Sequence, residues 1–182
     1  MLICVPTTVG TGSETTLAAV IVDSKTRHKY AINDFNLIPD YAVLDPKPTL
    51  SLPPFITACT GMDALSHAIE AYIGNSTTKK TRAYALKVTK LIFENIYKVY
   101  EDGNDLEARS NMFDAAFCAG HAFTVSYVDM CRRLLMGEKY NIAHGLTNAT
   151  LLDVVLKQYG ESVYKKLYEM ACILASHLHL VN

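Results

Sequence analysis

Two polar residues four positions apart, Asp63 and His67, could share one metal ion. On a helix such residues lie on the same face, and a carboxylate oxygen with an imidazole nitrogen suits Fe, Zn, Mn or Ni. The same spacing also fits an ordinary hydrogen-bonded pair on a solvated face. The flanking residues are apolar: Met62, Ala64, Leu65, Ala68 and Ile69. We therefore expect at least one of the two polar groups to be buried, where a charge needs a partner.

A second candidate is the stretch PTTVGTGSETT, which directly follows a short apolar run. Gly10 and Gly12 could let the backbone approach a ligand closely. Nearby hydroxyl groups could bond phosphate or ribose oxygens, and they belong to Thr7, Thr8, Thr11 and Ser13. The stretch is neither a Walker motif nor GxGxxG, and a tight turn with a Thr or Ser cap is the alternative.

A third candidate is His144, in YNIAHG, where a helix is expected to begin. The N-terminus of a helix disfavours a cation, so a neutral imidazole is favoured there, and a neutral imidazole is the form that binds a metal. A single histidine can equally be a hydrogen-bonded cap or a core residue.

The elements that must position these residues are mostly helical. Apolar periodicity predicts helices over residues 55–73, 81–100, 105–123, 145–159 and 162–180. Short runs of β-forming residues predict strands at 2–6, 18–22 and 41–44, and the prolines of 37–54 indicate an extended linker. The apolar helix faces need something to pack on, which indicates missing sequence, a homo-oligomer or a complementing chain.

Composition narrows the function classes. The chain has 182 residues and a net charge of −1, so no nucleic-acid footprint or membrane surface is expected. No apolar run approaches the roughly 18 residues that span a bilayer. The five cysteines form no CxxC pair, which is typical of reduced, mostly buried thiols in a cytoplasmic protein.

Five segments in this order resemble the iron-containing (group III) alcohol dehydrogenase family: PTTVGTGSE, LIPDYAVLDP, LSLPPFITACTGMDALSHAIEAY, DLEARSNMFDAAFCAGHAF and YNIAHGLTNATLL. The resemblance covers nearly the whole chain and implies a predominantly α fold. Residues 1–48 would be a short β/loop remnant of an α/β dinucleotide-binding domain. Residues 49–182 would be a C-terminal-type helical metal-binding domain, incomplete at its own C-terminus.

The resemblance also implies a site. Three of the family's four metal ligands match Asp63, His67 and His144. The matching residues on the cofactor side are Thr7, Thr8, Thr11, Lys29 and Thr49. The implied reaction is hydride transfer between NAD or NADP and a small alcohol or aldehyde, with Fe²⁺, or alternatively Zn²⁺, as Lewis acid.

This sequence departs from the family in three places. Relatives carry a further metal-binding histidine before the YNxPHG motif, but the segment MCRRLLMGEK at 130–139 has none. Arg132 aligns nearest to it, and a guanidinium cannot bind a metal. The open substitutes are Cys131, Asp129 and Glu138, with His121 weaker. Ala143 also replaces the usual proline, and the family's GGGS pyrophosphate loop would lie upstream of residue 1.

These departures leave a second interpretation open. The chain could be a truncated, non-catalytic helical fragment that binds metal or a partner subunit. A decayed fragment without activity is a further alternative.

Overall fold

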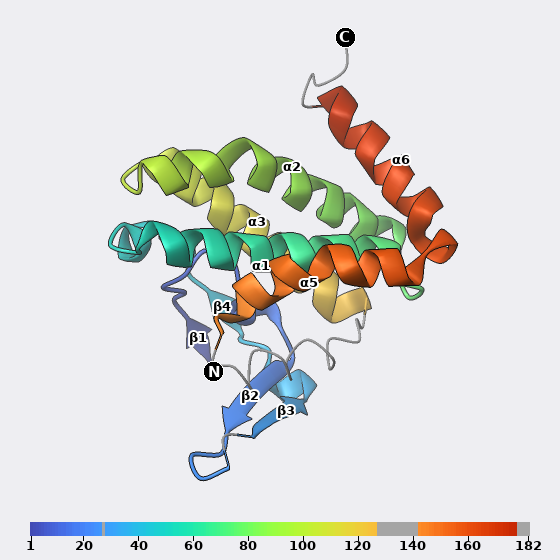
Figure 1. The fold of residues 1–182 in the computed structure, drawn as a ribbon. Helices are drawn as coiled ribbons and strands as arrows, with labels where there is room; N and C mark the ends of the chain where they lie inside the picture. The colour runs from blue at the N-terminus through green and yellow to red at the C-terminus, as the bar shows by residue number, and fades with distance from the viewer. Residues whose placement is uncertain (27, 127–141, 178–182) are drawn as a thin grey trace.

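The computed structural model describes residues 1–26, 28–126 and 142–177. Within these ranges the chain is mostly helical, as the sequence predicts (Figure 1). The helices are α1 (Pro54–Ile73), α2 (Lys79–Glu101), α3 (Leu106–Ser126), α5 (His144–Tyr159) and α6 (Glu161–His177). In the described part of the chain, no helix is both long and apolar enough to cross a membrane.

Helix α1 is the central element. It packs against α2, α3 and α5, whereas α6 projects from the bundle at one end (Figure 1). Every residue from Asp63 to Ala68 is buried, so α1 is enclosed on all sides over this stretch. A helix buried all round must bury its polar groups as well, and these then need partners inside the protein. The largest fully buried apolar side chains of the surrounding helices include Ile92, Met112, Phe113, Val88 and Val99.

Local signals fix the helix ends. Pro53 and Pro54 introduce α1, and a proline at the first helical position loses no hydrogen bond. Thr78 and Thr81 form a capping box at the start of α2. Asp105 caps α3, accepting a 2.9 Å hydrogen bond from the Ala108 amide.

Two long-range polar contacts hold the bundle together. The Lys166 ammonium of α6 donates to the carbonyls of Ile73 (2.7 Å) and Gly74 (3.2 Å), at the C-terminus of α1. Arg109 of α3 is fully buried and donates to Thr57 Oγ1 and to the Gly103 carbonyl, both at 2.9 Å. Its burial lowers the guanidinium pKa.

The strands form two small sheets on one side of the bundle (Figure 1). β1 (Ile3–Cys4) pairs parallel with β4 (Tyr41–Ala42), and β2 (Ala18–Val22) pairs antiparallel with β3 (Lys29–Asn33). The strands predicted at 2–6, 18–22 and 41–44 are confirmed, the first and last in shorter form. The 37–54 linker contains a 3-10 turn at Lys47–Thr49.

Strand β3 is not predicted from the sequence. Strand β2 is exposed over Val20, Ile21 and Val22, and Tyr30 and Ile32 of β3 are exposed as well. Because neither strand has a fully buried face, β3 shows no alternation of apolar and polar residues, which is the signal that identifies a strand.

The loop before β2 packs backbone to backbone on α1 and α3. A Cβ added to Gly10 would lie 1.8 Å from the Thr60 carbonyl oxygen of α1. Gly12 has a φ of 61°, and its added Cβ would lie 2.6 Å from the Ala116 carbonyl oxygen of α3. Both glycines are therefore required by packing within the protein, whatever their role toward a ligand.

Cysteine burial follows the sequence prediction only in part. Among the described cysteines, which are all free, Cys59 and Cys118 are buried, Cys4 is half-buried and Cys172 is exposed. Burial raises the pKa of the Cys59 and Cys118 thiols, as expected for small core residues.

We expect Gly10→Ala to destabilise the fold by about 3 kcal/mol, the upper end of the range for overpacking, because the Thr60 backbone cannot move without moving α1. Urea unfolding measures the change. Gly74→Ala is the matched control, since its Cβ would meet its nearest atom at 3.1 Å and its φ suits alanine. Equal urea midpoints for the two variants would contradict the claim that Gly10 is required for packing on α1.

Glu14 makes stability depend on pH. Its side chain is buried, and burial raises its pKa. The folded state therefore holds this proton more tightly than the unfolded state, so stability should fall as pH rises from the unfolded pKa to the folded one. We expect Glu14→Gln to abolish this fall and to stabilise the protein at neutral pH, by urea unfolding across mildly acidic to neutral pH. Glu101→Gln, which alters an exposed carboxylate, should retain the wild-type slope.

Candidate metal centre

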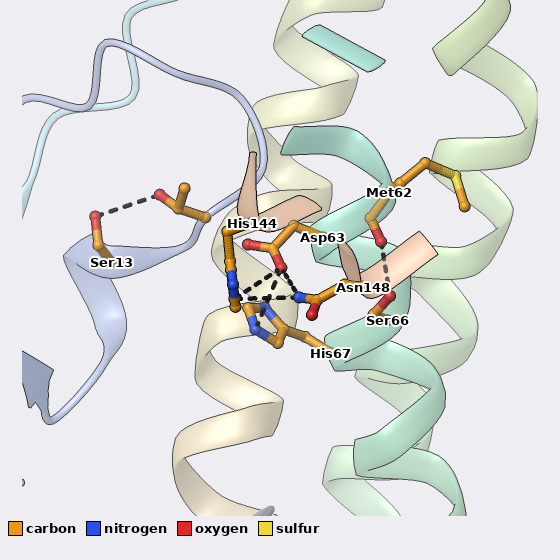
Figure 2. A network of polar contacts seen from close by, with 8 residues as sticks. Ser13, Met62, Asp63, Ser66, His67, His144 and Asn148 are labelled. Atoms are coloured by element: carbon orange, nitrogen blue, oxygen red, sulfur yellow. Dashed lines mark hydrogen bonds and ion pairs between the residues drawn. The ribbon is translucent and has the colours of Figure 1, made fainter. Parts of the chain in front are cut away.

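Four polar side chains from α1 and α5 meet in the interior (Figure 2). Asp63 and His67 lie one turn apart on α1 and are only 3% and 5% exposed. His144 is the first residue of α5, and Asn148, one turn further on, is fully buried. The burial expected for the Asp63–His67 pair is confirmed, and a solvated surface pair is excluded.

One carboxylate oxygen is the centre of the group. Asp63 Oδ1 lies 3.9 Å from His67 Nε2 and 3.6 Å from His144 Nε2. The Asn148 amide nitrogen donates to the same oxygen at 2.5 Å and lies 3.1 Å from His144 Nε2. Thus both histidines present the same ring nitrogen to the same carboxylate oxygen, although His144 and Asp63 are far apart in the sequence.

Glycine allows α5 to approach α1 closely enough for this contact. A Cβ added to Gly145 would lie 1.8 Å from the Cys59 carbonyl oxygen, one turn before Asp63. The start of α5, and with it His144, is therefore pressed directly onto the α1 backbone. From the side of α3, the Phe123 ring packs on the His67 imidazole with a centroid separation of 4.9 Å.

The donor types fit a divalent cation. One carboxylate and two imidazoles form a set that binds first-row metals. As they stand, no group of three His, Cys, Asp or Glu side chains in the described ranges is closed around an ion position. The Asn148 amide nitrogen contacts both Asp63 Oδ1 and His144 Nε2. Metal binding by Asp63, His67 and His144 therefore stays a prediction.

The hydroxyl-rich loop lies beside this centre. Thr60, three residues before Asp63 on α1, contacts the loop through Gly10 and donates to the Val9 carbonyl at 3.3 Å. Thr7 is exposed and Thr8 and Thr11 are half-buried. Thr11 also donates to Ser13 Oγ at 3.4 Å. Cofactor contacts by these threonines stay predictions.

The other two expected cofactor residues differ in environment. Thr49 is fully buried, and its hydroxyl donates to the Pro46 carbonyl at 2.7 Å, so its hydroxyl hydrogen is used within the turn. Lys29 lies in β3, paired with Val22, and its side chain is outside the described part of the structure.

The open substitutes for the fourth ligand differ as well. Residues 127–141, with Asp129, Cys131, Arg132 and Glu138, lie outside the described residues. His121 packs edge-on against Tyr84 of α2, at a centroid distance of 5.3 Å. Asn148 was not considered from sequence. Its position four residues after His144 on a predicted helix is the signal that could have identified it.

Comparison with known proteins finds two family models that match the chain. Residues 57–180 match the C-terminal model of the Fe-containing alcohol dehydrogenase family, and residues 1–46 match the iron-containing alcohol dehydrogenase model. Aldehyde-alcohol dehydrogenase 2 of Entamoeba histolytica is 42% identical over 90% of this chain and 19% of its own length. NADPH-dependent butanol dehydrogenase of Clostridium saccharobutylicum is 41% identical over 85% of this chain and 40% of its own.

Solved structures show the same fold. Alcohol dehydrogenase from Oenococcus oeni superposes with a TM-score of 0.90 at 30% identity, covering 99% of this chain and 48% of that one. Sulfoacetaldehyde reductase from Bifidobacterium kashiwanohense, in complex with NAD⁺, superposes with a TM-score of 0.87 at 32% identity, covering 94% and 46%. The chain thus spans less than half the length of these relatives. Together the two family models match most of the sequence, and the fold agrees with them: the chain belongs to the iron-containing alcohol dehydrogenase family.

Proposed function

We propose that this chain carries the metal-binding part of an NAD(P)-dependent alcohol dehydrogenase, with a divalent metal held by Asp63, His67 and His144. The observation that supports it most is the convergence of two imidazole nitrogens on Asp63 Oδ1 inside the protein, at 3.6 and 3.9 Å. Relatives that act as alcohol dehydrogenases share this part of the sequence.

The burial of Asp63 supports a cation at this place. A buried carboxylate is costly unless a positive charge or several donors compensate it. Among the described residues, the charged or chargeable partners of Asp63 are His67 and His144. A divalent ion between the carboxylate and two imidazoles would compensate the negative charge of the carboxylate and keep both rings neutral. We propose Fe²⁺, with Zn²⁺ as the alternative.

The chemistry follows from the site. A divalent metal at this centre would act as a Lewis acid toward the oxygen of a small alcohol or aldehyde. In alcohol oxidation, a bound nicotinamide would accept the hydride from the substrate carbon, and the hydroxyl proton would pass to solvent. Asp63, His67 and His144 would hold the centre in place. The burial of α1 would exclude water and so strengthen electrostatic interactions there.

The loop and hairpin would form the cofactor side. We place Thr7, Thr8 and Thr11 there because their loop packs on α1 one turn before Asp63, and Lys29 and Thr49 because they match the family's pattern. A neighbour of this fold binds NAD⁺, and NADP is the alternative. We divide the chain into a nucleotide-domain part, 1–48, and a helical part, 49–182, since the two family models meet between residues 46 and 57.

Exposed aromatic residues favour a second candidate, a non-catalytic fragment that binds metal or a partner subunit. Phe93 and Tyr97 of α2 are 58% and 71% exposed, and Tyr164 and Tyr168 of α6 are 53% and 73% exposed. Such residues could be covered by a second copy of the chain or by a complementing chain. Light scattering of the purified chain measures whether copies associate.

We expect Asp63→Asn to lower metal affinity by more than about 100-fold, because changes just outside a ligand shell already cost 10–100-fold. Titration with Zn²⁺ and elemental analysis measure the effect. Asp114→Asn is the matched control, because Asp114 is exposed on α3 and pairs with Lys87 at 3.8 Å. Unchanged Zn²⁺ binding in Asp63→Asn would remove this centre from consideration.

Catalysis by this chain alone requires that the metal-loaded chain oxidise NADH or NADPH in the presence of a small aldehyde, and that Asp63→Asn abolish the rate. Absorbance of the reduced nicotinamide measures it, with Asp114→Asn as control. A flat trace from folded, metal-loaded wild-type chain would exclude catalysis by this chain alone and favour the non-catalytic candidate.

A further inference from the structure

The Asn148 amide faces the ligand side of the centre. An amide that merely supports a metal ligand contacts it from behind, for example at His Nδ1. Asn148 instead contacts Asp63 Oδ1 at 2.5 Å and His144 Nε2 at 3.1 Å (Figure 2). These are the two atoms that face each other across the centre. The end of the Asn148 side chain therefore lies among the ligand atoms themselves.

The orientation of the amide is the one expected when its neighbours are acceptors. Asp63 Oδ1 accepts hydrogen bonds, Nε2 of His144 accepts one in the tautomer that carries the ring proton on Nδ1, and the amide NH₂ has two hydrogens to donate. This orientation leaves Asn148 Oδ1 buried with no hydrogen-bond partner in the described structure. The amide thus turns its positive end to the centre and leaves its best acceptor unused.

A cation reverses this preference. The N–H groups would be repelled by a positive ion held between Asp63 and the histidines, whereas the amide oxygen would be attracted to it. A half-turn about the Cβ–Cγ bond exchanges the two ends of the amide without moving the backbone. This rotation breaks the hydrogen bonds from the amide nitrogen, and contact of Asn148 Oδ1 with the ion would replace them.

We propose that Asn148 is the fourth ligand of the metal centre, binding through Oδ1. This inference rests on the proposed metal site at Asp63, His67 and His144. The sequence contains no histidine between His121 and His144, so the family's third histidine ligand has no counterpart in that interval. Asn148, fixed on the same helix as His144 and fully buried, restores a set of four. Carboxylate, carbonyl and imidazole donors commonly share one ion.

The test is Zn²⁺ affinity, measured by competition with a chromophoric chelator, for the full chain and for Asn148→Leu and Asn148→Asp. These three side chains are similar in size, but only asparagine donates, and only asparagine and aspartate offer an oxygen. Asn148→Asp adds a second carboxylate beside Asp63, so it is purified with Zn²⁺ bound. Asn95→Leu and Asn95→Asp are matched controls, because Asn95 is a buried helical asparagine on α2.

An oxygen ligand requires that Asn148→Leu bind Zn²⁺ at least about 10-fold more weakly, and that Asn148→Asp bind it as tightly as wild type or more tightly. The visible spectrum of the Co²⁺-loaded protein should change in Asn148→Asp and remain as in wild type in Asn95→Asp. Equal weakening in both Asn148 variants would overturn the proposal in favour of a hydrogen-bond donor role. Unchanged affinity in Asn148→Leu would also overturn it.

The outcome is separate from that of the proposed function. If the wild-type chain and Asn148→Leu bind Zn²⁺ with equal affinity, the proposed centre at Asp63 is retained and only the role of Asn148 is rejected. Wild-type chain that binds no Zn²⁺ would overturn both. If Asn148→Asp does not fold, Asn148→Thr replaces it, since threonine retains an oxygen donor and its Zn²⁺ affinity must then exceed that of Asn148→Leu.

Discussion

The contact between glycines and the α1 backbone is the constraint on which the centre depends. The carbonyls of Cys59 and Thr60 are neighbours on α1, and each is approached so closely that a Cβ on Gly145 or Gly10 would lie 1.8 Å away. The hydroxyl-rich loop and the start of α5 therefore meet the same turn of α1. Asp63 lies one turn further on, so both elements are placed next to it by backbone contact alone, without a side chain between them.

This arrangement explains why polar groups can lie inside the bundle. α1 is enclosed by α2, α3 and α5, and its burial removes water from Asp63 and His67. Two polar partners of the Asp63 carboxylate then come from α5: the imidazole of His144 and the amide of Asn148. A low local polarity makes each of these contacts stronger than it would be at the surface, and makes an unpaired charge more costly. Packing and electrostatics therefore act on the same four side chains.

The glycines of the loop illustrate how packing and ligand binding can be confused in a sequence. Gly10 and Gly12 suggested a backbone that approaches a ligand, and the structure shows that each is needed for approach to a neighbouring helix. Gly120 of α3 completes this contact, since its added Cβ would lie 2.4 Å from the Gly12 carbonyl oxygen. A cofactor that binds here would meet a loop already fixed on α1 and α3, which favours binding because little ordering is then required.

The sequence by itself determined the helices, their limits to within a few residues where the structure describes them, and the residue types of the candidate metal centre. Periodicity, prolines and caps are local signals, and the i,i+4 spacing of Asp63 and His67 fixes their relation on any helix. The sequence also predicted correctly that Asp63 and His67 are buried, because their neighbours in the sequence are apolar. Strand β3 was missed because it is exposed and has no periodic signal.

Only the tertiary structure decided which polar groups meet. His144 and Asn148 are 81 and 85 residues from Asp63, and nothing local specifies that α5 lies on α1 rather than on another helix. Gly145 permits the close approach to the Cys59 carbonyl, a contact between two surfaces that no single segment encodes. The same holds for Thr49, whose hydroxyl is already bonded to the Pro46 carbonyl in the folded chain. The residue types determine which donors and acceptors the chain contains, and close packing determines which of their atoms come into contact.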